Sequence, residues 1–231
     1  MNYGIHPSKE LLHIFKKKPY QGQQPEKAKV LILGNDANYS PEISNNVFFQ
    51  SILEYHSDGI SFWQKTGLHH PFLLSNYPFP KNTGGVPYHR NFSKMGFSSK
   101  QAEIFSFIEL LNVPTTGNTS TNKSKFYELM NPEYLSWLEY LIFNNSKKMV
   151  LLNKTICTEI TKISKKFNAL KTLNRIISHS NSSPILFEDA NALIYSGYSF
   201  SASISNKYIS GLSSDINAFI NTPQQTTTPT R

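Results

Sequence analysis

Four short, mainly apolar segments divide the chain, and each has the length of a strand. They cover residues 30–33, 104–111, 149–152 and 192–195. Apolar runs without strict alternation are typical of strands buried on both faces, as in the centre of a parallel sheet. A shorter run at 184–187 is expected to form an edge strand. The pattern therefore predicts one sheet with four parallel core strands.

Segments with helical spacing lie between these runs. Residues 10–15 predict a short helix, and Ser40-Pro41 predicts the N-cap and first position of a helix that continues to residue 52 or 53. Asn131-Pro132 opens another helix. Two later helices place their apolar residues on one face, at Ile156, Ile160, Ile163 and Phe167 and at Tyr208, Leu212, Ile216, Phe219 and Ile220. Alternating strands and helices predict a single α/β domain with helices on both faces of the sheet.

The domain is expected to span residues 1–221. The tail at 222–231 is rich in Thr, Pro and Gln and is expected to be disordered. Segment 67–97 is rich in aromatic residues, Pro and Gly instead of a periodic pattern. A long irregular segment inside a compact domain is usually functional, so it is the best candidate for the wall of a binding site.

The charge of the chain favours an anionic partner. There are 23 Lys and Arg residues against 15 Asp and Glu residues, which gives a formal net charge of +8. Only Arg90, Arg175 and Arg231 are arginines, so lysine carries the charge. Lysine suits diffuse attraction to phosphates better than bidentate reading of bases. The charge is therefore compatible with DNA, single- or double-stranded, but does not by itself establish it.

Cysteine content and hydropathy exclude several classes of protein. Cys157 is the only cysteine, which excludes an intrachain disulfide, a four-cysteine zinc site and an iron–sulfur cluster. His69, His70 and His89 fit no zinc spacing, so loop histidines are expected and no metal. No apolar run is long enough to span a membrane, and the N-terminus lacks a signal-peptide pattern. We expect an intracellular monomer, in the cytoplasm, nucleoid or nucleus, without cofactor or membrane.

The first apolar run ends in Gly34-Asn35-Asp36-Ala37-Asn38-Tyr39. In an open α/β sheet the carboxyl end of such a strand faces the ligand cleft, which makes Asp36 the first candidate for catalysis. A loop acid that caps the next helix is equally compatible with these residues. The stretch resembles motif A of the uracil-DNA glycosylase superfamily, Gly-Gln-Asp-Pro-Tyr-His in its best-known branch. It agrees in kind at Gly34, Asn35 and Asp36, and it departs at the last three positions.

Two further stretches match that family in the same order along the chain. Glu109-Leu110-Leu111-Asn112 resembles its Leu-Leu-Leu-Asn segment, whose Asn reads the pyrimidine edge. An amide offers the donor and acceptor that O4 and N3–H of uracil require. Phe72 lies where the family stacks an aromatic ring on the flipped base. A turn-capping Asn and a core Phe are the alternatives.

The last two matches concern DNA phosphates and the departing base. Pro87, Tyr88 and His89 fall in a segment that resembles the family's Pro-rich, phosphate-contacting helix start. The run 198–203 resembles motif B, His-Pro-Ser-Pro-Leu-Ser, in which the His stabilises the anionic base and the Leu wedges into the duplex. Here Ser201 and Ser203 remain as phosphate donors. Tyr198 stands in place of the His and Ala202 in place of the Leu.

The resemblance implies a three-layer αβα sandwich with a central four-stranded parallel sheet. It also implies hydrolysis of the N-glycosidic bond of uracil or another deaminated base in DNA, with catalytic Asp36 and Tyr198 and base-binding Asn35, Phe72 and Asn112. The departures at Tyr198 and Ala202 favour a second hypothesis, a nucleic-acid-binding relative without hydrolysis. A third, an unrelated enzyme acting on a nucleotide, lacks support because there is no Gly-rich phosphate loop.

Overall fold

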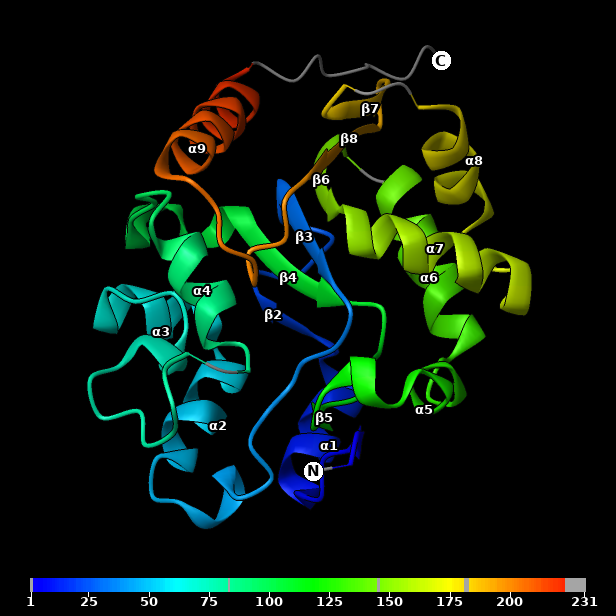
Figure 1. Ribbon diagram of the computed structural model, residues 1–231. Helices are drawn as coiled ribbons and strands as arrows, with labels where there is room; N and C mark the ends of the chain where they lie inside the picture. Colours follow the sequence, from blue (N-terminus) through cyan, green and yellow to red (C-terminus); the bar gives the residue numbers. More distant parts are fainter. Residues whose placement is uncertain (1, 83, 145, 181–182, 223–231) are drawn as a thin grey trace, which may run out of the picture.

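A six-stranded mixed sheet forms the centre of the computed structural model, which describes residues 2–82, 84–144, 146–180 and 183–222 (Figure 1). The four predicted core strands are parallel neighbours, and a short antiparallel strand lies at each edge. The spatial order is β2 (Tyr20–Gly22), β4 (Phe105–Glu109), β3 (Val30–Gly34), β6 (Lys148–Asn153), β8 (Ala192–Gly197) and β7 (Ile185–Glu188).

The prediction of a four-stranded, all-parallel sheet is therefore corrected to six strands. The edge strand expected at 184–187 is confirmed as β7, which pairs antiparallel with β8. β2 was not expected, because its three residues lie in a polar stretch that carries no periodic signal. Backbone pairing with β4, from Tyr20 opposite Ile108 to Gly22 opposite Ser106, defines this strand.

Helices cover both faces of the sheet, which makes three layers (Figure 1). Leu31 and Leu33 of β3 pack on one side with α6 (Pro132–Phe143), α7 (Lys154–Phe167) and α8 (Lys171–His179). Val30 and Ile32 pack on the other side with α3 (Gly59–Thr66), α4 (Val86–Ser93) and α9 (Asn206–Asn221). Side chains alternate along a strand, so a strand between two helical layers must be apolar at every position.

A third apolar cluster lies beside the sandwich, where α1 (Lys9–Lys17) and α2 (Phe49–Ser57) pack on the segment that follows β3. Near it, β1 (Gly4–Ile5) pairs antiparallel with β5 (Thr115–Thr116). The short helix α5 (Lys123–Glu128) precedes α6. No helix in the described part of the chain is long and apolar enough to cross a membrane.

The positions at which helices begin show which sequence signals predicted a helix start correctly. Asn131 caps α6 as predicted, since its Oδ1 accepts a hydrogen bond from the Tyr134 N–H. The helix predicted from Ser40-Pro41 is wrong: Ser40 donates to Glu42, a 3-10 turn follows at Ile43–Asn45, and α2 begins only at Phe49. Asn46 interrupts the helix because its side chain accepts from the Phe48 N–H. Thr222 follows α9, and residues 223–231 of the predicted tail lie outside the described residues.

Candidate functional site

The loops after β3 and β4 lie side by side at the carboxyl edge of the sheet. Beyond the strands, Leu111 N donates to Asn35 O at 3.1 Å, and Thr115 N donates to Ala37 O at 2.9 Å. The parallel ladder thus continues into both loops. Asp36 and Asn112 consequently stand at the same edge, as the sequence predicted.

Hydroxyl groups surround the carboxylate of Asp36. Tyr3 Oη and Thr115 Oγ1 donate to its Oδ2, the former at 3.2 Å, and Thr119 Oγ1 donates to Oδ1 at 3.1 Å. Burial and the charge of Asp36 raise the pKa of Tyr3, which keeps the phenol protonated as a donor. A carboxylate has about four acceptor positions. Within the described residues three are occupied, and one on Oδ1 is left for a water or a ligand.

The two amides differ in how their side chains are used. Asn35 is partly buried, and its Oδ1 is buried without a hydrogen-bond partner among the described residues. Asn112 is half-buried in the loop after β4. A buried unpaired carbonyl is unfavourable by about 1–3 kcal/mol, so Asn35 Oδ1 is an unsatisfied acceptor at this edge.

Phe72 is buried rather than presented to a cleft. Its side chain is 4% exposed, and its ring meets Tyr39, His70 and Tyr77 at centroid distances of 5.7, 4.3 and 5.0 Å. Gly85 lies so close that an added β-carbon there would sit 2.9 Å from the Phe72 ring. Stacking on a base, as predicted, requires these neighbours to move.

The residues predicted to contact phosphate on α4 point mainly inward. His89 is buried and stacks on His70, with the two rings 3.6 Å apart and 9° from parallel. Tyr88 packs edge-on against Phe200, and its Oη is buried without a partner among the described residues. Pro87 is partly buried in the first turn of α4. As placed, His89 does not present its ring to a phosphate.

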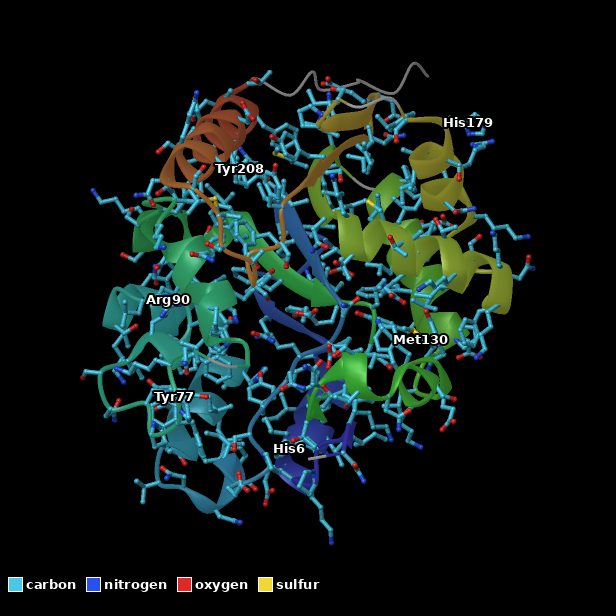
Figure 2. All side chains as sticks on the ribbon, in the orientation of Figure 1. His6, Tyr77, Arg90, Met130, His179 and Tyr208 are labelled. Atoms are coloured by element: carbon cyan, nitrogen blue, oxygen red, sulfur yellow. The ribbon has the colours of Figure 1, made fainter. Side chains whose placement is uncertain are left out.

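The segment after β8 is mostly exposed except at Phe200, which is buried, and hydrogen bonds tie it to α9 and α4. Tyr198 is 60% exposed, and its N–H donates to Tyr208 Oη at 3.0 Å; Tyr208 lies on α9 (Figure 2). Asn91 of α4 donates to Phe200 O at 2.7 Å and to Ala202 O at 3.0 Å. The side chains of Ser201, Ala202 and Ser203 are exposed. The side chains of the two serines are therefore accessible to solvent.

A small pocket lies where this segment meets the sheet. Its lining includes Leu33 of β3, Asn153 of β6, and Tyr88, Tyr198 and Phe200. Its volume is about 10 Å³. That volume is close to the minimum for one water, whereas ligand pockets have roughly 300–1,000 Å³. In this conformation the pocket does not hold a base.

Sequence reasoning missed Glu109 as a site residue. It is the last residue of β4 and lies opposite Gly34 in the parallel pairing, at the same edge as Asp36. Burial, and then the charge of Asp36, raise the pKa of its carboxyl well above the ordinary 4.5. The sequence signal that could have identified Glu109 is an acidic residue at the end of an apolar strand, with a glycine at the end of the neighbouring strand.

Within the described residues, no group of three or more His, Cys, Asp or Glu side chains is arranged to hold a metal ion. Comparison with known proteins finds no matching family model, no matching curated protein and no matching solved structure. The functional argument therefore depends on the geometry at the carboxyl edge.

Proposed function

We propose that this protein is a monofunctional DNA glycosylase with a uracil-DNA glycosylase-like fold. It hydrolyses the N-glycosidic bond of uracil or another deaminated base that is flipped out of DNA. The observation that carries the proposal is the position of Asp36. Three hydroxyls orient its carboxylate at the carboxyl edge of the sheet, in a loop that is hydrogen-bonded to the loop carrying Asn112.

The proposed chemistry follows from charge. Breaking the bond builds positive charge on the sugar and negative charge on the departing base. The anionic Asp36 stabilises the sugar cation, and its unfilled position on Oδ1 accepts a hydrogen bond from the water that attacks C1′. Asn112 provides the amide that selects the base edge. No cofactor is required for this reaction.

Entry of a base requires the segment 198–203 to move, since the pocket beneath it is small. Hydrogen bonds from the Tyr198 N–H to Tyr208 and from the Asn91 amide to Phe200 and Ala202 hold this segment. The buried ring of Phe200 packs against Tyr88 and Phe92, so this packing must also open. In this proposal the exposed Ser201 and Ser203 exchange solvent for DNA phosphate when the segment moves. Binding of DNA is thus coupled to opening in this proposal.

The test is incubation with oligonucleotides that carry uracil, hypoxanthine or xanthine, each single- and double-stranded. Alkaline cleavage then reveals abasic sites. We expect one of these bases to be released with multiple turnovers. Release of none of them would contradict the proposal.

A DNA-binding protein without hydrolysis is the second candidate. The exposure of Tyr198 and the small pocket favour it, because neither a histidine nor an open base site is present at the expected place. DNA binding at low salt without release of any base would favour this candidate over the enzyme.

Both candidates predict DNA binding that is strongly dependent on salt. Lysine-rich positive charge binds phosphates by releasing counterions, so the logarithm of the affinity falls linearly with the logarithm of salt concentration, with a slope of about −0.9 per phosphate contact. Fluorescence anisotropy with two unrelated duplexes between 50 and 200 mM salt, a range of about fourfold, measures this slope. We expect a steep slope that is equal for both sequences. A flat dependence would contradict both candidates.

The enzyme proposal predicts that Asn112→Asp changes which base is accepted. An aspartate at this position accepts hydrogen bonds but does not donate one when ionised, so it no longer matches the O4 and N3–H pair of uracil. We expect the ratio of rates between uracil and hypoxanthine substrates to change by roughly tenfold or more. Asn118→Asp is the matched control, since it makes the same change at an exposed position whose side chain caps a turn at Ser120. Equal ratios in both variants would remove Asn112 from base recognition.

A further inference from the structure

The side chain of Glu109 lies directly over the backbone of β3. In the β3–β4 pair Glu109 is opposite Gly34. An added β-carbon at Gly34 would overlap Glu109 Oε2 and would lie 2.9 Å from Oε1. The φ angle of Gly34 is not in the left-handed region, so close approach, not backbone conformation, explains a glycine here. The absence of a side chain at Gly34, two residues before Asp36 in the sequence, thus leaves room for the carboxyl group of Glu109.

The carboxyl of Glu109 has no compensating partner. Among the described residues no cation lies within ion-pair distance of it, and no side chain or backbone group hydrogen-bonds its oxygens. Only its main-chain oxygen is bound, by Tyr134 Oη at 2.9 Å. The residue as a whole is half-buried.

Glu159, a buried glutamate elsewhere in the fold, shows how this protein stabilises a structural acid. Glu159 of α7 is 3% exposed, and it is paired with Lys123 at 3.0 Å and accepts from Tyr127 Oη at 2.6 Å. These partners lower its pKa, whereas burial and Asp36 raise that of Glu109. Unlike Glu159, Glu109 is therefore not stabilised as a member of an ion pair among the described residues. An acid that retains its proton carries one O–H donor.

Two polar atoms at the carboxyl edge of the sheet also lack hydrogen-bond partners within the described residues. Tyr88 Oη and Asn35 Oδ1 are buried without partners in the described part of the chain. Burial, and then the charge of Glu109, raise the pKa of Tyr88. Tyr198, which stands where the resembling family has its histidine, is 60% exposed instead. The sheet itself thus offers a carboxyl group, that of Glu109, near the expected position of the departing base.

We propose that Glu109 is the acid of this site and donates its carboxyl proton to the departing base. The inference rests on the proposed glycosylase function. As the bond from C1′ to the base nitrogen breaks, its electron pair goes to the base, which takes the Glu109 proton on a ring nitrogen or carbonyl oxygen. Water adds its oxygen to C1′ and loses a proton to Asp36. Asp36 then releases that proton to solvent, and solvent returns a proton to Glu109. The products are the free base and an abasic sugar.

The test is the pH dependence of the single-turnover rate in wild type, Glu109→Gln and Glu103→Gln. Glutamine keeps the size and a hydrogen-bond donor but carries no transferable proton. We expect the wild-type rate to fall as pH rises and Glu109 loses its proton. In Glu109→Gln the rate should be lower by roughly 10²–10⁴-fold, without that alkaline limb. Glu103, exposed just before the start of the same strand, is the matched control and should give the wild-type profile.

The outcomes are distinct. If the wild type releases a base and Glu109→Gln has an unchanged rate and pH profile, the acid role is overturned and the glycosylase proposal stands. If the wild type releases no base, both are overturned. A ¹³C-carboxyl NMR titration compares the free wild type with Glu109→Gln. A Glu109 resonance that titrates near the ordinary 4.5 would also overturn the acid role.

Discussion

Asp36→Asn is expected to lower the rate of base release by roughly 10²–10³-fold, with little change in DNA affinity. The amide has no negative charge to stabilise the sugar cation, and it offers one acceptor oxygen where the carboxylate offers two. In the proposed mechanism the charge acts only in the transition state, so we expect DNA binding to be largely retained. Single-turnover rates and anisotropy binding curves measure the two quantities separately.

The control for this variant must separate chemistry from stability. Asn at 36 loses acceptor capacity toward Tyr3, Thr115 and Thr119, so the folded state is also destabilised. Thermal melts define the temperature at which both proteins are folded for the assay. Asp58→Asn is the matched substitution, because Asp58 is exposed and caps α3, a role that Asn fills equally well. An active wild type and an equally active Asp36→Asn variant would rule out this role.

The sequence predicted the parts of the fold that rest on continuous patterns. The four core strands were predictable because a strand between two helical layers is apolar at every position, as Val30, Leu31, Ile32 and Leu33 are. Predicting that these strands are parallel also implied that Asp36 and Asn112 share an edge. Such conclusions need only the pattern of apolar residues along each strand and the order of strands and helices along the chain.

The remaining features depend on tertiary contacts. The three residues of β2 form a strand only because β4 presents an edge to them, and α2 starts late because Asn46 bonds to the backbone. Phe72 was predicted as a stacking surface and is buried, because an aromatic residue in a Pro- and Gly-rich segment packs as readily as it binds. Glu109 was read only as part of a motif, since the glycine that accommodates it is 75 residues away in the sequence (109 − 34).

A cluster of buried histidines lies under α4 and beside Phe72. His56, His69, His70 and His89 are each at most 6% exposed. His69 Nε2 lies 3.2 Å from His89 Nδ1, and the ring of His70 stacks on that of His89. His56 contacts Tyr39 Oη through Nε2 at 2.6 Å, and its Nδ1 has no partner among the described residues. Burial lowers the pKa of all four, to about 3 for His56 and His69.

We therefore expect the protein to lose stability as pH falls below 6.5, the ordinary pKa of histidine. As pH falls below 6.5 the unfolded chain binds protons that the folded chain excludes, and for His56 and His69 this continues to about pH 3. Each histidine in this range reduces the free energy of unfolding by roughly 1 kcal/mol per pH unit. Above pH 6.5 both states are neutral at these positions and the effect vanishes. Against a typical stability of about 5–15 kcal/mol, the combined loss from these groups is large enough to unfold the domain in acid.

Urea unfolding followed by circular dichroism, repeated at steps from pH 7.5 to 5, measures this loss, and its slope with pH counts the protons taken up. His69→Gln should reduce the count by about one, because glutamine keeps an N–H near the position of Nε2 but does not titrate. His13→Gln, at an exposed position on α1, should leave the slope unchanged. The packing of the cluster explains why its histidines resist protonation in the folded state. His70 and His89 face each other as parallel rings, so adding a proton to either places a charge in an apolar aromatic contact. A free energy of unfolding that stays constant from pH 7.5 to 5 would show that these histidines protonate without unfolding the domain.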